Sequence, residues 1–317
     1  MQNTHKRMGQ LTSMHVMLSK AQRNRYAIGA FNFTDLVDVQ AALLAAEQER
    51  TPLVLQIHPA GIDLLGLPYA AGMVKIAAEH ARVPLALHLD HSQQLGPIED
   101  CIEAGFCSVM IDGSKLPLAA NIELTREAVK MAHKAGVYVE AELGRVASGA
   151  EIIPESENEK YLTDPCEAQE FIDKTGADAL AIAIGSAHGF YRVQHPDLDF
   201  GRLRQIRKLI QAPLVLHGGS GLPECQIRRA IELGITKINV HTDLIEAYST
   251  AQRALVTTTS DLVWSSQVLE HGRRAIAEAV KAKLRLFGGS GQSGCGLDSR
   301  HQSGTMGTYS DGSRHHD

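Results

Sequence analysis

The chain has 317 residues and a mass of 34.3 kDa, with 44% hydrophobic and 21% charged residues, which excludes a disordered or fibrous protein. A net charge of -5 and a pI near 6.3 argue against nucleic acid or an anionic membrane as a partner. Fifteen histidines, beside one tryptophan and seven each of tyrosine and phenylalanine, hint at metal or proton chemistry.

The five cysteines are scattered, odd in number and without a Cys-x-x-Cys pair. This pattern indicates reduced thiols rather than a disulfide framework or a zinc ribbon. The first ten residues are polar with no apolar run behind them, so no signal peptide is indicated. No stretch approaches the roughly 20 apolar residues of a membrane span. We therefore expect a cytoplasmic protein that does not enter a membrane.

Eight short runs rich in Val, Ile, Leu and Ala follow one another along the chain. Each is nearly continuous in its apolar character, as expected for parallel strands that are covered on both faces. The eight predicted strands are Tyr26–Phe31, Pro52–Ile57, Pro84–Leu89, Ser108–Ile111, Val137–Glu142, Ala179–Ile184, Pro213–His217 and Thr236–Val240.

Amphipathic stretches lie between and after these runs, and several carry helix boundary signals. Asp164 and Pro165 provide a cap and a first-turn proline, and Gly136, Gly176 and Gly234 stand where helices should end. The predicted helices are Asp38–Arg50, Leu118–Ala135, Pro165–Thr175, Gly201–Ile210, Pro223–Leu233, Asp243–Leu255 and Val268–Phe287.

A strand followed by a helix, eight times within roughly 250 residues, predicts an α/β fold of the (β/α)8 TIM-barrel class with an extra C-terminal helix. A doubly wound sheet is the structural alternative, but it usually has fewer strands and a glycine-rich first turn. Neither a G-x-G-x-x-G sequence nor a Walker A motif follows the first run, which disfavours dinucleotide and P-loop sites.

We divide the chain into an N-terminal extension (1–16), one barrel domain (17–287) and a tail (288–317). The tail is rich in Gly, Ser and His and is expected to be disordered. The segment from Gly144 to Leu162 is a long polar connection after the fifth strand. A loop of that length in a compact barrel favours an active-site lid.

Three histidines stand at the carboxyl ends of predicted strands, where barrels carry their active sites. His91 ends the third strand, His188 follows the sixth and His217 ends the seventh. Taken singly, each could be a hydrogen-bonded polar residue at a strand end. Together, three imidazoles with an open fourth position are the ligand set of a catalytic zinc ion.

Carboxylates share this end of the predicted barrel. Asp90 precedes His91, Asp112 follows the fourth strand, and Glu140 and Glu142 lie on one face of the fifth. A carboxylate beside a dication is held ionised and can move a proton or orient a ligand. For Glu140 the alternative is an ion pair inside the barrel, with Lys237 of the eighth strand.

Small and hydroxyl-bearing residues follow the seventh and eighth strands, where barrels commonly bind phosphate through backbone N–H groups. The seventh-strand loop is Gly218, Gly219, Ser220 and Gly221, and the eighth-strand loop is Asn239, Val240, His241, Thr242 and Asp243. The alternative is a tight turn with Asp243 as a helix cap.

Six ordered motifs, spread from about Met17 to Gly288, resemble the class II, metal-dependent ketose-bisphosphate aldolases, and most closely the tagatose- and fructose-bisphosphate branch. They are Leu87–His91, Ser108–Ser114, Val139–Gly144, Ala181–Gly189, Leu214–Gly221 and Lys237–Val240. The resemblance implies reversible cleavage of a ketose 1,6-bisphosphate, or a related ketose 1-phosphate, to dihydroxyacetone phosphate and an aldehyde.

The resemblance also implies roles for individual residues. His91, His188 and His217 would bind zinc, Asp90 would exchange the proton of the C4 hydroxyl, and a second cation position would lie at Asp112 and Glu142. The residues expected to contact substrate are Gly189, Gly218, Gly219, Ser220, Asn239, Val240, His241, Thr242, Asn32 and His58. Family members also use a loop glutamate as a base, and Glu151 is the candidate here.

The chain departs from the family at the far end of the substrate. His58, Pro59 and Ala60 stand where a serine-containing turn is frequent, and Lys115 stands where histidine is frequent. The group bound there could therefore be a phosphate, another anion such as a sulfonate, or a neutral group.

Two rival functions remain open. One is an aldolase that forms a Schiff base on Lys237, and the other is a non-catalytic sugar-phosphate-binding paralogue or subunit. The resemblance and the C-terminal helix lead us to expect a homodimer or homotetramer. An accessory subunit is a further partner found with some tagatose-branch enzymes.

Overall fold

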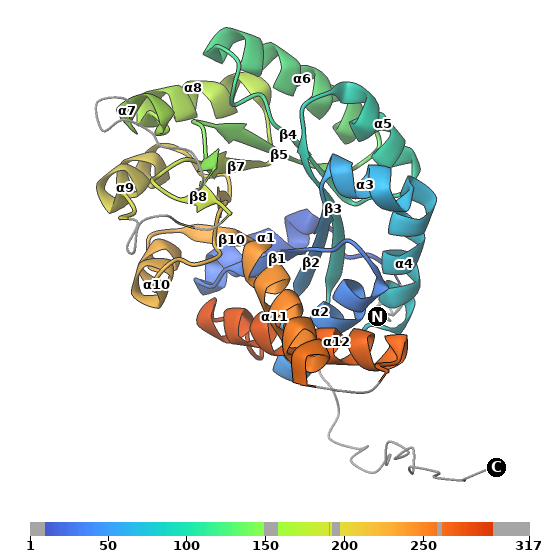
Figure 1. Cartoon of the computed structure of the whole chain (residues 1–317). Helices are drawn as coiled ribbons and strands as arrows, with labels where there is room; N and C mark the ends of the chain where they lie inside the picture. The colour runs from blue at the N-terminus through green and yellow to red at the C-terminus, as the bar shows by residue number, and fades with distance from the viewer. Residues whose placement is uncertain (1–9, 149–157, 190, 192–196, 259–261, 294–317) are drawn as a thin grey trace, which may run out of the picture.

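The computed structural model describes residues 10–148, 158–189, 191, 197–258 and 262–293. Eight parallel strands close into a barrel in the order β1-β10-β9-β7-β5-β4-β3-β2, which confirms the predicted TIM-barrel class (Figure 1). Their bounds are β1 Ile28–Asn32, β2 Leu53–Ile57, β3 Leu85–Ser92, β4 Ser108–Ile111, β5 Tyr138–Leu143, β7 Ala179–Ile182, β9 Leu214–Leu216 and β10 Ile235–Val240. Two short strands, β6 Ala147–Ser148 and β8 Ala187–His188, pair outside the barrel.

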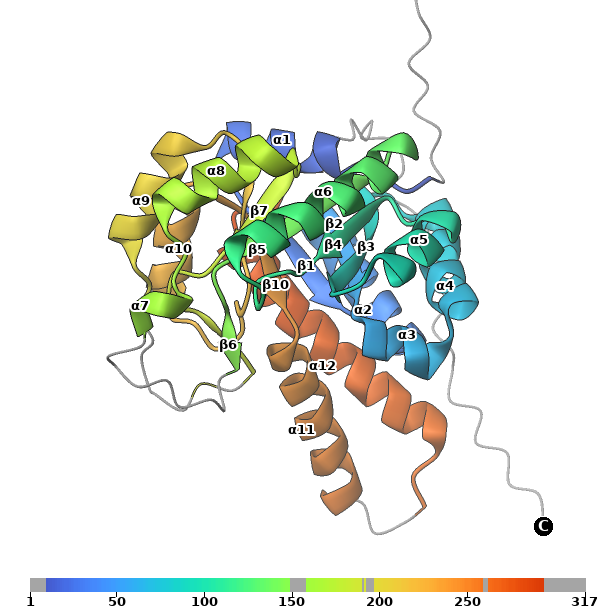
Figure 2. The same ribbon diagram turned by 90° about the horizontal axis from the view of Figure 1, so that it is seen from above.

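The helices surround the barrel, and the seven predicted from sequence lie where they were expected, with shifts at their ends. They are α2 Leu36–Glu49, α6 Leu118–Lys134, α8 Pro165–Thr175, α9 Phe200–Leu209, α10 Glu224–Glu232, α11 Thr242–Thr258 and α12 Ser265–Leu286. The structure adds α1 Met14–Asn24, α3 Pro59–Leu65, α4 Leu67–His80, α5 Leu95–Glu103 and α7 Asn158–Tyr161. Figure 2 shows the far ends of α11 and α12 projecting together from the barrel.

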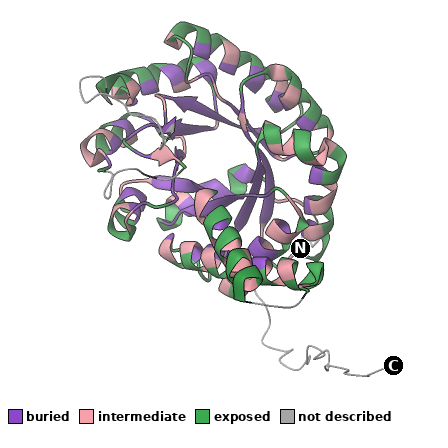
Figure 3. Cartoon of the chain, in the orientation of Figure 1, coloured by how far each residue is buried: buried purple, intermediate pink, exposed green. Residues whose placement is uncertain are grey.

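Alternate residues of each strand point into the barrel. These inward residues divide the interior into an apolar half and a polar half. At the amino ends of the strands, Ile28, Val54 and Val215 form an apolar cluster that Met14 and Leu18 of α1 close from below. Farther toward the carboxyl ends of the barrel strands, the buried residues are polar: Gln56, His88, Glu140, Lys237 and Asn239. Figure 3 shows how completely the strands are covered.

The two ends of the chain lie partly outside the described residues. α1 begins within the predicted extension, at Met14. The first residues of the predicted tail pack on α2, where the N–H groups of Gly291 and Ser293 donate to the carbonyls of Glu49 and Arg50. Residues 294–317 lie outside the described part.

No single helix in the described part of the chain is long and apolar enough to span a membrane. One sharply bent pair, α3 with α4, passes that test by length and composition alone.

A buried threonine joins the ends of β5 and β7, where the two strands separate. The Thr163 hydroxyl donates to the carbonyl of Leu143 and accepts from the N–H of Ala183 at 2.8 Å. Gly144, at φ +78, makes room for it, since a Cβ there would lie 2.5 Å from the hydroxyl oxygen. This contact fixes the start of the segment that leads to His188.

We expect Thr163→Val to lower the free energy of unfolding by about 2–6 kcal/mol. The substitution keeps the shape of the side chain but leaves a buried carbonyl and a buried N–H unpaired, at roughly 1–3 kcal/mol each. Thr163→Ser keeps both hydrogen bonds and loses one methyl group, so it should cost about 1 kcal/mol or less. Urea denaturation of the three proteins measures the difference. Equal stability of the valine and serine variants would contradict this role for the hydroxyl.

Candidate active site

A cavity of about 620 Å³ opens at the carboxyl ends of the strands. It is lined by most of the residues predicted from sequence: Asn32, His58, Asp90, His91, Asp112, Glu142, His188, Gly189, Gly218, Ser220, Asn239, His241 and Thr242. His217 is fully buried beneath it. Val240 is also fully buried and packs in the outer core, so its side chain does not face this site. Glu151 lies outside the described residues.

The three predicted histidines meet in space although they come from distant parts of the chain. The ring centres of His91 and His217 lie 4.6 Å apart, and that of His188 lies 5.0 Å from His91 and 5.8 Å from His217. One nitrogen of each ring falls within 4.8 Å of the others, as a shared metal ion would require. His91, Asp112 and Glu142 form a second such group beside the first.

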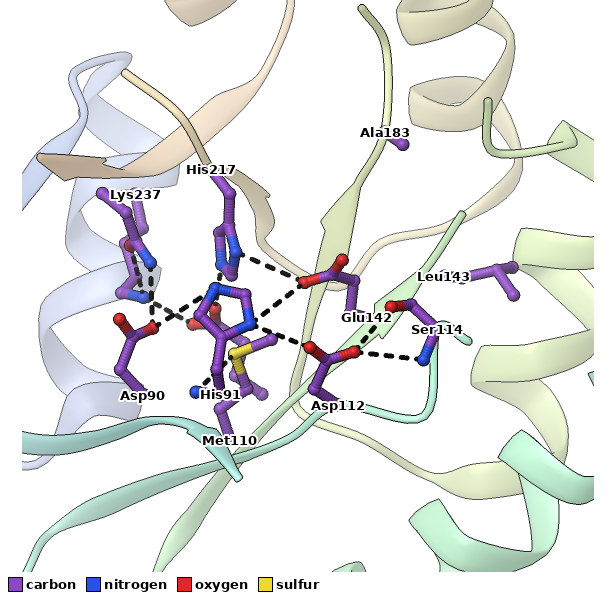
Figure 4. Close-up of polar contacts among 12 residues, drawn as sticks. Asp90, His91, Met110, Asp112, Ser114, Glu142, Leu143, Ala183, His217 and Lys237 are labelled. Carbon is purple, nitrogen blue, oxygen red and sulfur yellow. Dashed lines mark hydrogen bonds and ion pairs between the residues drawn. The ribbon is translucent and has the colours of Figure 1, made fainter. Parts of the chain in front are cut away.

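His91 is placed by an irregularity in its strand. The pairing register of β3 with β4 shifts between Leu89 and Ser92, and His91 has a φ of +51. That left-handed conformation is strained for a residue with a side chain, at roughly 1–3 kcal/mol. The bulge re-aims the ring, so that Nδ1 lies 3.0 Å from Asp112 Oδ2 and donates to it (Figure 4). Nε2 then carries the lone pair.

His217 is oriented by a carboxylate on the side away from the cavity. Its Nε2–H donates to Glu140 Oε1 at 2.9 Å, and its Nδ1 lies 3.3 Å from Glu142 Oε2. Among the described residues, Nδ1 of His217 and Nε2 of His91 have no hydrogen-bond partner although both are buried. Two unpaired, buried nitrogens facing one point fit a metal ion bound by imidazoles.

The charges of the cluster are unevenly distributed. Burial, together with repulsion from His91 and His217, lowers the pKa of His188 to about 3. Burial alone would lower the pKa of His217 too, but its hydrogen bond to Glu140 and the nearby carboxylate of Glu142 outweigh burial and raise that pKa to about 10. Without a metal ion, these carboxylates therefore keep a proton on His217.

Asp90 is held by three amide donors. Asn239 Nδ2 donates to Oδ1 at 3.1 Å, and Asn32 Nδ2 and Gln56 Nε2 donate to Oδ2 at 3.0 and 3.1 Å. Burial would raise the pKa of Asp90, but the charges of His91, His217 and Lys237 outweigh it and hold that pKa well below its usual range. Asp90 is therefore ionised and ready to accept a proton.

Gln56 was not predicted from sequence. It is fully buried, and its Nε2 also donates to Asn32 Oδ1 at 2.8 Å. The available signal was a polar residue in an otherwise apolar strand, at an inward-facing position of the alternation.

The predicted phosphate loops meet at the start of α11. The Ser220 hydroxyl accepts from the N–H of Asp243 at 3.2 Å, in the first turn of that helix. Gly219 N–H donates to the carbonyl of Asn239 at 3.0 Å, so this glycine packs the turn against β10 instead of offering a free donor. A Cβ on Gly218, at φ +68, would lie 2.2 Å from the carbonyl oxygen of Ala187. The result is a helix N-terminus beside the cavity, which suits an anion.

Tyr191 joins this turn to the His188 segment and was also missed from sequence. Its hydroxyl donates to the carbonyl of Gly218 at 2.9 Å and accepts from the N–H of Ala187 at 3.0 Å. Because β8 pairs with β6, the long loop after β5 begins directly beside His188.

The loops after β4 and β5, across the barrel from β10, bring Lys115 and Arg145 to the opposite wall of the cavity, and His58 lines the cavity from the end of β2. Nδ1 of His58 accepts from the N–H of Ala60 at 3.2 Å, which leaves Nε2–H as its donor. Burial lowers the pKa of His58, with Asp90 opposing the effect, so the ring is neutral at pH 7. The cations on this wall are thus Lys115 and Arg145.

Lys237 does not offer a free amine to the cavity. It is fully buried, and its Nζ lies 2.9 Å from Glu140 Oε2 and donates to Asn239 Oδ1 at 2.8 Å. The internal ion pair considered from sequence is thereby confirmed. Formation of a Schiff base on Lys237 would have to break that ion pair. It would also leave the three histidines without a role.

Comparisons with known proteins agree on one family. Residues 12–292 match the family model described as "Fructose-bisphosphate aldolase class-II". A fructose-bisphosphate aldolase of Geobacillus stearothermophilus is 42% identical over 285 residues, which cover 89% of this chain and 98% of that protein.

Solved structures give the same result. The YdjI aldolase of Escherichia coli K12 aligns with a TM-score of 0.80 and 31% identity, covering 90% of this chain and all of that one. A putative fructose-1,6-bisphosphate aldolase of Coccidioides immitis aligns with a TM-score of 0.78 and 30% identity, over 88% and 97% of the two chains.

We expect zinc affinity of the metal-free protein to rise about tenfold per pH unit between pH 6 and 8. Below its pKa of about 10, His217 must lose a proton before it can bind a metal ion, so each rise in pH weakens that competition. Calorimetry in buffers of different ionisation enthalpy would count the protons released.

Two variants serve as controls for this prediction. His217→Ala should weaken binding and release fewer protons. His188→Ala should weaken binding without changing the number released, because that ring is already neutral. An affinity that does not vary across this pH range would contradict the prediction.

Proposed function

Since the chain belongs to the class II fructose-bisphosphate aldolase family and is an aldolase, a lyase, we propose that it is zinc-dependent and reversibly cleaves a ketose 1,6-bisphosphate of the fructose or tagatose type. The products would be dihydroxyacetone phosphate and an aldehyde. One observation carries the proposal: three converging histidine nitrogens lie beside an ionised aspartate, between a helix N-terminus and a cationic wall.

His91, His188 and His217 would hold the zinc ion; their convergence and the unpaired buried nitrogens of His91 and His217 support that assignment. Bound there, zinc supplies a Lewis acid for the negative charge that develops on the ketose half during cleavage. Asp112 and Glu142, which form the second group with His91, would hold a further divalent or monovalent cation.

Asp90 would perform the proton transfer that breaks the C3–C4 bond. Its ionised carboxylate accepts the proton of the C4 hydroxyl, the C4 oxygen becomes the aldehyde oxygen, and the bonding electrons remain on C3. In condensation the same group returns the proton to the new C4 hydroxyl. The amides of Asn32, Gln56 and Asn239 hold the carboxylate in place while its charge changes.

The dihydroxyacetone phosphate end would lie against the loops after β9 and β10. Gly218, Ser220 and Thr242 line that side, and the first turn of α11 adds its positive dipole end. The aldehyde end would then point to the opposite wall, where Lys115 and Arg145 favour an anion such as the second phosphate.

The remaining assignments follow the family. Glu151 would remove the C3 proton of dihydroxyacetone phosphate in the condensation direction, and its loop begins beside His188. We also propose a cytoplasmic location, which four free cysteines among the described residues support. We further propose a homodimer or homotetramer, which the projecting ends of α11 and α12 support.

Removal of the metal tests the function directly. Treatment with EDTA should abolish cleavage of fructose and tagatose 1,6-bisphosphates, and added zinc should restore it, because the developing charge on the ketose half then has no counter-charge. The same assay with ketose 1-phosphates that end in a sulfonate or a neutral group would establish the distal preference. Full activity in EDTA, or substrate trapped by borohydride on Lys237, would refute the zinc mechanism.

We expect Asp90→Ala to keep its zinc and to lower kcat for cleavage by about 10²–10⁴-fold, the usual contribution of a positioned acid–base group. Exchange of the C3 proton of dihydroxyacetone phosphate with solvent deuterium should continue, since that step does not involve the C4 hydroxyl. Asp100→Ala, an exposed change on α5, is the matched control. Retention of full cleavage by Asp90→Ala would remove Asp90 from the reaction.

A further inference from the structure

The ammonium group of Lys237 is buried in the polar half of the barrel. Lys237 Nζ contacts Glu140 Oε2 at 2.9 Å and donates to Asn239 Oδ1 at 2.8 Å, and the lysine has no exposed surface. A register shift in β10 between Ile235 and Lys237 accompanies this inward placement. The proposed reaction assigns no step to Lys237, although a buried charge is maintained there at considerable desolvation cost.

One contact leads to the metal position. Glu140 uses one carboxylate oxygen for Lys237 and the other for Nε2 of His217, at 2.9 Å. A carboxylate only accepts hydrogen bonds, so in the neutral ring this contact places the proton on Nε2 and leaves the lone pair on Nδ1 for the group formed with His91 and His188. Lys237 fixes the position of Glu140 and balances its charge.

The other contact leads to the proton-transfer group. An ammonium only donates hydrogen bonds, so Lys237 requires the amide of Asn239 to turn its oxygen inward. The NH₂ group of Asn239 then faces Asp90 and donates to Oδ1 at 3.1 Å. Without the ammonium, the amide could rotate and present an oxygen to a carboxylate.

We propose that Lys237 is a positioning residue that orients both halves of the active site, the metal ligand His217 through Glu140 and the proton acceptor Asp90 through Asn239. The inference rests on the proposed zinc-dependent aldolase function. Lysine suits this place because its three donors can serve two acceptors on different strands, which an uncharged side chain of the same length cannot do.

Lys237→Met tests the proposal, because methionine has a similar length and no donor. Zinc affinity, measured by competition with a chelator, should fall about 10–100-fold, because Glu140 loses the group that holds it against His217. The visible spectrum of the cobalt-substituted protein should change. At saturating zinc, kcat should fall about 10–100-fold, with a smaller change in KM.

A second variant separates the two contacts. Lys237→Met combined with Glu140→Gln removes both buried charges, so that neither is left unpaired, and the glutamine oxygen can still accept from His217. This variant should regain most of its zinc affinity, while kcat stays low because Asn239 is still without its donor. Should Lys237→Met alone fail to fold, this variant decides the question.

Thr236→Val is the matched control. Thr236 is the neighbouring buried residue of β10, and its hydroxyl donates to the carbonyl of Leu214 at 3.1 Å, outside this network. It should lose stability without a change in zinc affinity, cobalt spectrum or kcat.

Two results would overturn the proposal. One is a folded Lys237→Met protein with unchanged zinc affinity and kcat, and the other is full recovery of kcat in the double variant. Failure of the proposed function looks different: the parent protein would bind zinc without cleaving any ketose phosphate. The affinities and cobalt spectra would then still test the contact with His217.

Discussion

The ion pair between Lys237 and Glu140 is the contact on which the rest of the site depends. It joins β10 to β5 inside a barrel where neither residue reaches water. Burying two charges is favourable only when both find further hydrogen bonds. Here those bonds go to Asn239 and His217, so the groups that stabilise the pair are also groups of the proposed active site.

The division of the barrel interior explains why such a network is tolerated. The lower half is filled by apolar side chains and closed by α1, so the fold does not need the upper half for its hydrophobic core. The upper half can then hold His88, Gln56 and other polar groups at fixed positions under the cavity. Stability and chemistry thus occupy opposite ends of the same eight strands.

The sequence alone could locate the strands, their carboxyl ends and the three histidines, because periodicity and strand order are local properties. It could not locate the features that depend on tertiary contacts. The left-handed backbone of His91 accompanies a shifted pairing register between two strands. The hydroxyl of Tyr191 connects Ala187 with Gly218, and only the fold brings these two loops together. Gln56 could have been predicted from the sequence, since it is a polar residue at an inward position of an otherwise apolar strand.

The buried charges give a physical reason why this arrangement calls for a dication. The pKa values of Asp90, Asp112 and Glu140 are all held below their usual range, and Lys237 is the buried ammonium that opposes them. Glu142 adds a carboxylate in contact with His91 and His217. Part of this excess of acid is balanced by a proton on His217, whose pKa is raised to about 10. In the proposed function a divalent ion at the same point would replace that proton and bind the freed ring nitrogen, so the metal and the proton would compete for one preformed site.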